Sequence, residues 1–366
     1  MKFIPVASPN LEHKEARAVF KTVKSGWISM GKKVQEFEKR VAQFTKAKYA
    51  IAMNNGTSTL DSILTALQIK ENDEVIVPSL TYISTANVAL YKKAKLVLCD
   101  SNKSTFNIEP DSILQKITKK TKLIIVTDMK GMPVDYDFFK KLSQKTNIPI
   151  IADSAESLGA EYKNKKVGNQ LLAHSFSFFA NKNITTGEGG MVVTNSKHLS
   201  EKLRIIRNQG QNTRYNHIIL GNNYRMPDIL AAIGIEQIKK LKKIIIKKNK
   251  IAAKYNKELS KIKDLKIPYI PSYVSQHAWY NYAIRVNPRV RNKLINYLRN
   301  KKIETRLSFP PIHTQPYYKE KFKFTKKYAP QADEVYKEFI DIPIWADLKT
   351  IQQTRIINSI KFFFNN

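Results

Sequence analysis

Short apolar runs alternate with helix-like stretches through the middle of the chain. The helix-like stretches include residues 85–93 and 135–145, which separate several of the runs. This rhythm predicts a mostly parallel sheet covered by helices, and in such sheets ligands bind at the carboxyl ends of the strands. The runs expected to form the sheet are EVIVPS, KLVLCD, KLIIVTD, IPIIAD, SFSFF and GGMVVT.

Helical spacing dominates the N-terminal residues. Segments 12–26 and 32–45 carry apolar positions three and four apart, and the apolar hinge 26–31 lies between them. A strand is predicted at 49–53, followed by a glycine turn and a hydroxyl-rich entry into the helix LDSILTALQI. A helix that begins directly after a strand presents free amides to an anion, so this turn is a candidate anion seat.

The length of 366 residues predicts a large domain and a small one. A long amphipathic stretch introduced by Pro227 and Asp228 is predicted to be a helix that ends the large domain near residue 245. The rest of the chain holds two further helical stretches, a strand-like run YNYAIRV and a closing helix, and no repeat or low-complexity linker. We therefore expect a large domain over 1–245 and a smaller C-terminal α/β domain over 246–366.

The net charge of +33 invites a nucleic-acid hypothesis. However, the basic residues are mostly lysines scattered in pairs among Ile and Asn, which fits an A- and T-rich genome equally well. We expect no nucleic-acid partner and infer only that a cationic surface helps to collect anionic substrates.

The sequence shows no pattern typical of a metal site, a disulfide framework or a membrane-spanning segment. Cys99 is the single cysteine, and no apolar run approaches membrane-spanning length. The N-terminus lacks the apolar core of a secretion signal, so we expect a cytoplasmic protein with no membrane partner. No metal is expected, because five of the six histidines show no ligand spacing. They are His13, His174, His198, His217 and His277.

The stretch from Ser175 to Asn195 carries the strongest candidate chemistry. It places Lys182 between two probable strands and before the tight turn TTGEGG, where a small ligand can come close. Burial there would favour the neutral amine, which attacks a carbonyl to form a Schiff base. Asp153, at the end of an apolar run, is an acid in the right kind of place to face a cofactor's pyridinium nitrogen. A lysine, an acid and a phosphate cup are what pyridoxal phosphate needs from its protein.

Purely structural roles are possible for two of these features, the NNGTST segment and Tyr82. The NNGTST segment fits an ordinary N-cap with a turn glycine, and on its own that interpretation is the better one. Tyr82, beyond the Pro78 turn, either stacks on a planar cofactor or simply packs.

With these motifs placed, the chain resembles the DegT, DnrJ and StrS family of sugar aminotransferases. The resemblance covers nearly the whole length, in the order SGWIS, NNGTSTL, DEVIVPSLTYISTAN, IIADSAESLGAEY, SFSFFANKNITTGEGG, GNNYRM and PPIH. It implies the fold-type I, aspartate aminotransferase-like fold, with a seven-stranded sheet and pyridoxal 5'-phosphate as cofactor. It further implies transfer of an amino group from L-glutamate to a nucleotide-linked keto sugar.

The resemblance also implies site residues, position by position. Lys182 would hold the cofactor, Asp153 would pair with its ring nitrogen, Glu156 would lie near its phenolic oxygen and Tyr82 would stack on it. A neighbouring subunit would supply one phosphate contact, which implies a homodimer with shared active sites. The phosphate cup would be Gly56, Thr57, Ser58, Ser177 and Asn223. Substrate contacts would come from Trp27, Ser29, Glu188, Arg225 and His313.

Three alternatives for function stay open. The motifs WIS, VPSLTYI and ITTGEGGM resemble most the members that aminate C4 of GDP-4-keto-6-deoxy-D-mannose. The second alternative is amination at C3, or of a UDP- or dTDP-linked sugar, and the third is a non-catalytic regulatory protein that binds the cofactor. The family's dehydratase type has histidine in place of the lysine, so Lys182 indicates transamination. Asp128 and Lys130 depart from the family's usual histidine and tyrosine on the substrate side, which leaves the sugar's identity open.

Overall fold

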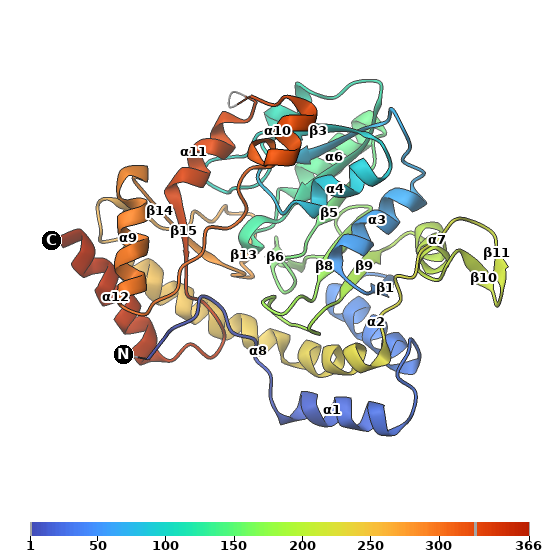
Figure 1. Ribbon diagram of the computed structural model, residues 1–366, viewed down its shortest axis with the longest axis horizontal. Coiled ribbons are helices and arrows are strands. Elements are labelled where there is room, and N and C mark those ends of the chain that lie inside the picture. Colours follow the sequence, from blue (N-terminus) through green and yellow to red (C-terminus); the bar gives the residue numbers. More distant parts are fainter. Residues whose placement is uncertain (1, 326–327, 366) are drawn as a thin grey trace.

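The computed structural model describes residues 2–325 and 328–365. At the centre of this part of the chain lies a seven-stranded sheet (Figure 1). The strand order is β1-β9-β8-β5-β4-β2-β3. Only β9 runs antiparallel to its neighbours, so the expected mostly parallel sheet is confirmed. The strands are β1 (Tyr49–Met53), β2 (Glu74–Pro78), β3 (Lys95–Cys99), β4 (Thr121–Thr127), β5 (Ile150–Asp153), β8 (Ala173–Ser177) and β9 (Gly190–Thr194).

Alternate residues of each strand enter different cores, because successive side chains point to opposite faces of a sheet. In β5, Ile150 and Ala152 join one hydrophobic cluster and Ile151 joins another. The first cluster is covered by α2 (Lys32–Thr45), α6 (Tyr136–Thr146) and α8 (Asp228–Leu259). The second is covered by α3 (Gly56–Ala66), α4 (Ser84–Tyr91) and α7 (Lys197–Arg207). The sheet is therefore buried on both faces, as its apolar runs predict.

Helix α8 is the longest connection between the two halves of the molecule. Its 32 residues run without a break through residue 245, where the sequence predicted a domain boundary. Its first half packs on the seven-stranded sheet, and from Ile251 onward it belongs to the C-terminal core. At its start, Asp228 accepts hydrogen bonds from the backbone N–H groups of Gly31 and Val34, which ties α8 to the beginning of α2.

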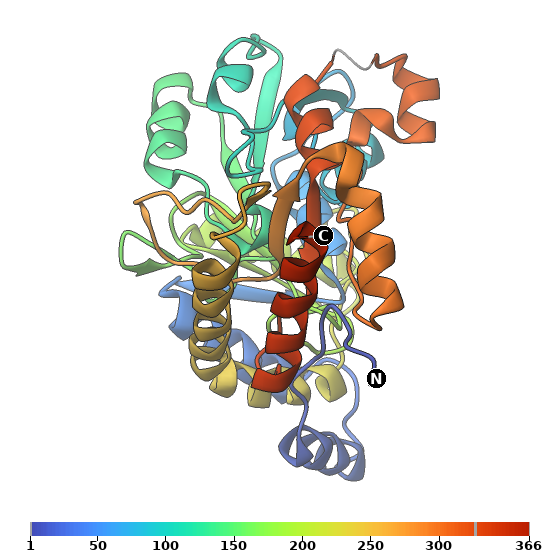
Figure 2. The same ribbon diagram turned by 90° about the vertical axis from the view of Figure 1, so that its left-hand side faces the viewer.

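The C-terminal core forms around a three-stranded antiparallel sheet and the end of α8. The sheet order is β12-β14-β15. Ile4 pairs with Ile303 and is buried in this core, so the first residues of the chain belong to it (Figure 1, N and C labels). Figure 2 shows α12 beside α8 along this part. Its elements are β12 (Leu265–Lys266), β14 (Tyr282–Val286), β15 (Phe339–Ile342), α9 (Pro288–Asn300), α11 (Pro330–Glu338) and α12 (Thr350–Asn365).

The remaining helices and strands are short or lie outside the two main sheets. A hairpin of β10 and β11 projects from the body at one edge, and α1 lies against α8 (Figure 1). No helix within 2–325 or 328–365 has the length and apolar character needed to cross a lipid bilayer. The remaining elements are α1 (His13–Lys24), α5 (Pro110–Leu114), α10 (Pro316–Phe322), η1 (Met129–Gly131), η2 (Ile312–Thr314), β6 (Glu161–Tyr162), β7 (Lys165–Lys166), β10 (Gln211–Thr213), β11 (Asn216–His217) and β13 (Val274–Gln276).

Substitution of Gly234 by Ala is expected to destabilise the contact between α2 and α8. An added Cβ would lie 2.6 Å from the ring of Phe37, which is fully buried and has no space to retreat. Overpacking costs about 1–3 kcal/mol, whereas the gain in helix propensity is about 1 kcal/mol or less, so we expect a net loss. Urea unfolding of Gly234→Ala measures it. Lys242→Ala, at an exposed position of the same helix, is the matched control, and an equal or higher stability for Gly234→Ala would contradict this packing.

Candidate active site

A cavity of about 460 Å³ lies at the carboxyl ends of β4, β5 and β8 and the start of α3. The loops that follow the strands supply one wall, and residues of the C-terminal part supply the other. The lining includes Asn55, Gly56, Thr57, Thr81, Tyr82, Ser84, Thr127, Met129, Asp153, Ala155, Glu156, Ser177, Phe179, Asn181, Lys182, Glu188, Tyr280, Arg306, Ser308 and Phe309. The structure thus brings eight of the residues expected at the site into one cavity: Gly56, Thr57, Tyr82, Asp153, Glu156, Ser177, Lys182 and Glu188.

Lys182 points its amine into a largely buried, acidic environment. Its side chain is 12% exposed, with Nζ 3.7 Å from Glu156 Oε1 and 4.2 Å from the centre of the Tyr280 ring. Burial alone would lower the pKa of Lys182, but Tyr280, Glu156 and Asp153 together outweigh it and raise the pKa above its usual value. The expectation of a neutral amine was therefore wrong for the protein alone, because the acidic neighbours favour the ammonium form.

Asp153 ends β5 and is buried beneath the cavity floor. The hydroxyl of Thr85 donates to its Oδ2 at 2.7 Å, and the N–H of Ala155 donates to its Oδ1 at 3.2 Å. Burial raises the pKa of this carboxyl, against the opposing effect of those two hydrogen bonds and of Lys182. A cation opposite Asp153 would reverse that shift, so the carboxyl is suited to face one.

Glu156 has one satisfied and one unsatisfied carboxylate oxygen. Its Oε2 accepts a hydrogen bond from the backbone N–H of Lys130 at 2.7 Å. Its Oε1 is buried and has no hydrogen-bond partner within 2–325 and 328–365. Burial raises the pKa of Glu156, although Lys182 and Lys130 act against the shift. A buried oxygen without a donor at a cavity wall indicates a ligand group that supplies one.

The start of α3 has the close backbone packing of an anion seat. Asn55 caps the helix by accepting from the N–H of Ser58 at 2.8 Å, so the simple N-cap interpretation is correct for that amide. A Cβ at Gly56 would lie 3.1 Å from Cβ of Ser177, and one at Gly190 would clash with the carbonyl of Asn55. Gly56, Thr57 and Ser177 line the cavity, whereas Ser58 lies behind it, 5% exposed.

Two of the expected residues lie at the cavity rim. Tyr82 is 54% exposed and contacts Phe309 edge-on, with 5.3 Å between ring centroids. Glu188, in the glycine-rich turn, is also exposed. Both side chains are free to meet a ligand that enters from solvent.

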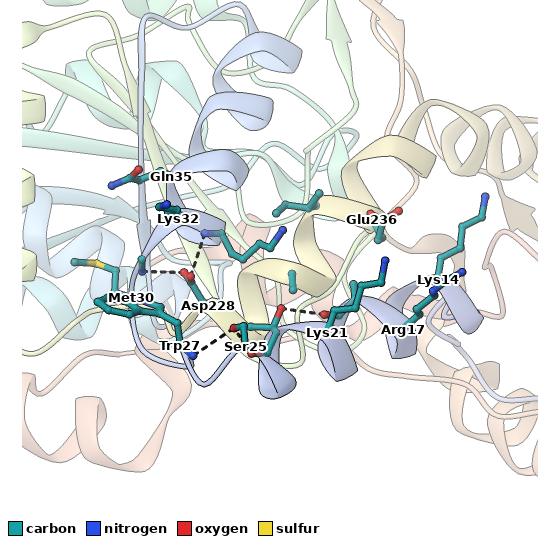
Figure 3. A pocket seen from close by; sticks show the side chains of 16 residues that line it. Lys14, Arg17, Lys21, Ser25, Trp27, Met30, Lys32, Gln35, Asp228 and Glu236 are labelled. Atoms are coloured by element: carbon teal, nitrogen blue, oxygen red, sulfur yellow. Dashed lines mark hydrogen bonds between the residues drawn. The ribbon is translucent and has the colours of Figure 1, made fainter.

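Besides Ser58, five expected residues do not line this cavity in the single chain. Trp27 lies in a second cavity of about 960 Å³ between α1, α2 and α8 (Figure 3), and the carbonyl of Ser29 accepts from the N–H of Asp228. Arg225 donates to Asn208 at 2.6 Å, and Asn223 pairs with Asn208 through the backbone. His313 is fully buried, with Nδ1 2.6 Å from the Ser79 hydroxyl.

Asp128 and Lys130, in the turn after β4, are also absent from the cavity lining. The carboxylate of Asp128 is fully buried and accepts from the hydroxyls of Tyr136, Ser154 and Ser157. Lys130 is 3% exposed. Neither side chain lines the cavity of this chain, because Asp128 is bonded to those hydroxyls and Lys130 is paired with Asp341.

The sequence did not single out Tyr280, Arg306 or Ser308, which form the wall opposite the strand ends. Tyr280 lies just before β14, and Arg306 and Ser308 lie in the segment after α9 that pairs with β15, all far along the chain from Lys182. Arg306 and Ser308 belong to the RLSFPPIH segment, but without the fold nothing ties them to Lys182. Thr85, in the motif SLTYISTAN, was likewise unassigned.

Lys248 lies behind the Lys182 loop and is expected to make stability depend on pH. It is 5% exposed, its Nζ donates to Asn183 Oδ1 at 2.8 Å, and burial lowers its pKa to about 7. In the unfolded chain this lysine has an ordinary pKa of about 10.4. Between about pH 7 and about pH 10.4 the unfolded state therefore binds one more proton than the folded state, so this residue makes the free energy of unfolding rise with pH in that range. We expect urea unfolding of Lys248→Met to lose that rise between pH 7 and 9.5. Parallel pH curves for wild type and variant would contradict the shift.

A lysine, a buried acid and a helix start around one cavity of a mostly parallel sheet define a pyridoxal-phosphate-dependent enzyme. The model of the DegT/DnrJ/EryC1/StrS aminotransferase family matches residues 9–361, and the chain belongs to that family. Its members are pyridoxal-phosphate-dependent sugar aminotransferases, and the chain is an enzyme of this class. The residues fit the cofactor, because the orphaned Glu156 oxygen and the close Gly56–Ser177 packing leave room and partners for it.

Three relatives illustrate the match. GDP-perosamine synthase of Escherichia coli O157:H7 is 38% identical over 369 residues, which cover 100% of both chains. Helicobacter pylori PseC, an aminotransferase involved in the biosynthesis of pseudoaminic acid, superimposes with a TM-score of 0.94 at 27% identity, over 100% of both chains. Spr1654 from Streptococcus pneumoniae, in its PMP form, gives a TM-score of 0.95 at 27% identity, covering 100% of this chain and 98% of the other.

Proposed function

We propose that this enzyme transfers the amino group of L-glutamate to C4 of a nucleotide-linked 4-keto-6-deoxy sugar. The acceptor is GDP-4-keto-6-deoxy-D-mannose and the product is GDP-perosamine. The observation that carries the proposal is full-length similarity to a GDP-perosamine synthase at 38% identity, together with the cavity that holds Lys182. Because such charged acceptors do not cross a membrane unaided, we place the reaction in the cytoplasm.

The cavity residues divide the work of binding the cofactor. The carboxylate of Asp153 would pair with the ring nitrogen, and Glu156 would accept a hydrogen bond near the phenolic oxygen through its free Oε1. Tyr82 would cover the ring from the rim. The phosphate would lie at the start of α3, where the helix amides and dipole favour an anion. The phosphate contacts would be Gly56, Thr57 and Ser177, whereas Ser58 lies behind them with its N–H and hydroxyl bonded to Asn55.

When bound, pyridoxal phosphate supplies a carbonyl carbon for attachment and a ring that takes up the electron pair left by a departing proton. Nζ of Lys182 acts as general base and acid. It removes the α-carbon proton of glutamate in the first half-reaction and returns a proton to C4 of the sugar in the second. The carboxylate of Asp153 would pair with the ring nitrogen and stabilise positive charge there.

A homodimer with shared sites completes the proposal. Five expected residues besides Ser58 lie outside the cavity of their own chain. His313 is buried, and the other four would serve the site of the neighbouring chain: Asn223, Trp27, Ser29 and Arg225. The projecting β10–β11 hairpin is followed by exposed apolar residues, among them Leu220 at 90% exposure, on an edge that a second chain would cover (Figure 1). We propose that Asn223 contacts the cofactor phosphate of the partner subunit.

Mixed dimers test this sharing directly. Lys182→Ala and Asn223→Asp are each expected to be inactive, the second because it places a carboxylate against the phosphate. In an equal mixture after subunit exchange, half of the dimers are mixed and each has one intact site, so about one quarter of wild-type activity should return. A mixture that stays inactive although light scattering shows subunit exchange would contradict shared sites.

The acceptor is tested with a panel of 4-keto sugars linked to GDP, UDP and dTDP, each incubated with glutamate. We expect 2-oxoglutarate release to be fastest with the GDP-mannose series, and nuclear magnetic resonance of the product to show the amine at C4. A product aminated at C3, or a preference for UDP or dTDP, would overturn the proposed acceptor. The fold similarity to PseC keeps that second candidate in the test.

A further inference from the structure

A buried ion pair stands behind the cavity wall that the C-terminal part supplies. Nζ of Lys130 lies 2.8 Å and 3.0 Å from the two carboxylate oxygens of Asp341 and 4.1 Å from the centre of the Phe339 ring. The side chains are 3% and 0% exposed. Asp341 also accepts from the amide of Asn281 at 3.0 Å and from the hydroxyl of Ser308. Both carboxylate oxygens are therefore satisfied without any ligand.

This pair joins the two walls of the site. Lys130 lies in the turn after β4, and its backbone N–H holds Glu156 on the cofactor side. Asp341 lies in β15, and its backbone N–H and C=O bond the C=O and N–H of Arg306 at 2.9 Å and 3.0 Å. The Asp341 carboxylate therefore holds the side chain of Ser308, and the Asp341 backbone holds the backbone of Arg306. Both of those residues line the cavity.

Among the described residues, the guanidinium of Arg306 has no hydrogen-bond or ion-pair partner. Its side chain is half-buried, and no carboxylate or carbonyl within 2–325 and 328–365 accepts from its guanidinium. Its charge acts on the phenol of Tyr280, whose ring contacts Nζ of Lys182. A half-buried guanidinium that faces a ligand cavity without an acceptor is suited to a planar anionic group, which it can bind through two N–H donors.

A buried ion pair of this kind contributes little net free energy to the stability of a fold. Removing two charges from water costs several kcal/mol per ion, and well-packed apolar residues often stabilise as well or better. The turn carries Lys130 at a positive φ of 61°, a conformation that disfavours side-chain-bearing residues. This placement therefore favours a role in positioning over one in stability alone.

We propose that Arg306 binds an anionic oxygen group of a substrate, and that the Lys130–Asp341 pair positions Arg306 and Ser308 for that contact. The inference rests on the proposed function, which supplies two sources of such a group. One is a carboxylate of the amino donor, and the other is a phosphate of the nucleotide-linked acceptor. Lys130 is thus a positioning residue that acts through Asp341, and Arg306 is the residue that touches substrate.

The test uses the cofactor-loaded enzyme and three variants. Arg306→Met removes the guanidinium, Arg306→Lys keeps the charge without the paired donors, and the double variant Lys130→Met/Asp341→Asn replaces the pair without leaving a buried charge. Arg289→Met, at an exposed position of α9, is the matched control. Thermal unfolding of each protein shows whether it is folded before binding is compared.

The first measurement is calorimetric titration with 2-oxoglutarate, together with the rate of the glutamate half-reaction at increasing glutamate. A lost charged hydrogen bond weakens binding by about tenfold or more, which we expect for Arg306→Met, with a smaller loss for Arg306→Lys. The double variant should weaken binding several-fold while the rate at saturating glutamate is nearly unchanged. A purely structural pair would lower the melting temperature without this change in affinity.

The second measurement is KM for the nucleotide sugar in steady state. A rise in this KM with 2-oxoglutarate binding unchanged assigns the anion to the acceptor's phosphate and supports the inference. If Arg306→Met changes neither, substrate binding by Arg306 is overturned. If Arg306→Met changes the 2-oxoglutarate affinity or the nucleotide-sugar KM, but the folded double variant changes neither quantity, the positioning role of the Lys130–Asp341 pair is overturned. Should no nucleotide sugar be accepted, the proposed function fails, while the donor measurements still decide this inference.

Discussion

Lys182→Ala is expected to abolish amine transfer and leave a folded protein. The variant removes the amine that carries protons at the reacting carbons and attaches the cofactor. General acid and base catalysis alone contributes about 10²–10⁴-fold, and loss of the attachment adds to it, so turnover should fall by about 10³-fold or more. Release of 2-oxoglutarate with glutamate and the accepted nucleotide sugar measures the loss.

The folded state of this variant follows from the surroundings of Lys182. Its Nζ lies 3.7 Å from the nearest carboxylate oxygen, beyond hydrogen-bond distance, and its main contact is with the ring of Tyr280, so its removal breaks no buried hydrogen bond to a carboxylate. Lys197→Ala, on the exposed N-terminal turn of α7, is the matched control and should keep wild-type turnover. Turnover of the Lys182 variant within tenfold of wild type would overturn its catalytic role.

Residues close together in the sequence, or at the ends of apolar runs, were the predictable part of the site. Asp153 and Lys182 follow strands that end at the same edge of a parallel sheet, so their types and positions were enough to place both in one cavity. The start of α3 was predictable for the same reason. Here the local pattern and the fold agree, because the runs form strands that are buried on both faces of the sheet.

Tertiary contacts decide the part that local pattern could not predict. Tyr280 and Arg306 reach the cavity from the C-terminal part, whose core includes the end of α8 and the first residues of the chain. The amphipathic pattern of α8 does not show which core each half enters. Nor does sequence show that Tyr280 and two acids surround Lys182, which is why the direction of its pKa shift was wrong.

The departure after β4 shows how similar residues can have different roles in one turn. Asp128 and Lys130 are both ionisable and lie two positions apart, yet they serve different networks. Asp128 binds hydroxyls on the α6 side of the sheet, and Lys130 crosses to β15. Lys130 influences the site only through the residues it positions. A change of residue type at a family position therefore changes specificity only when the fold brings it, or a group it holds, to the ligand.

Asp153→Asn is expected to produce the second large loss of activity. The carboxylate is buried, and its charge is the group that stabilises positive charge on the cofactor ring while a substrate proton is moved. Loss of one such electrostatic contact costs about 10²–10³-fold in kcat, and Asn keeps the shape and the hydrogen bond from Ala155 without the charge. Because Asp153 lies beneath the cavity floor, KM for glutamate should change little, so kcat and kcat/KM fall together.

Thr85→Val provides a graded comparison, because it keeps the charge of Asp153 and removes the hydroxyl that orients it at 2.7 Å. We expect a smaller fall in kcat, about tenfold, since the carboxyl group stays in place but is less well held. The order wild type, Thr85→Val, Asp153→Asn in kcat would show that charge matters more than orientation. If Asp153→Asn retained kcat within tenfold of wild type, or lost activity only through a higher KM, the buried charge would not be what drives the proton transfers at Lys182.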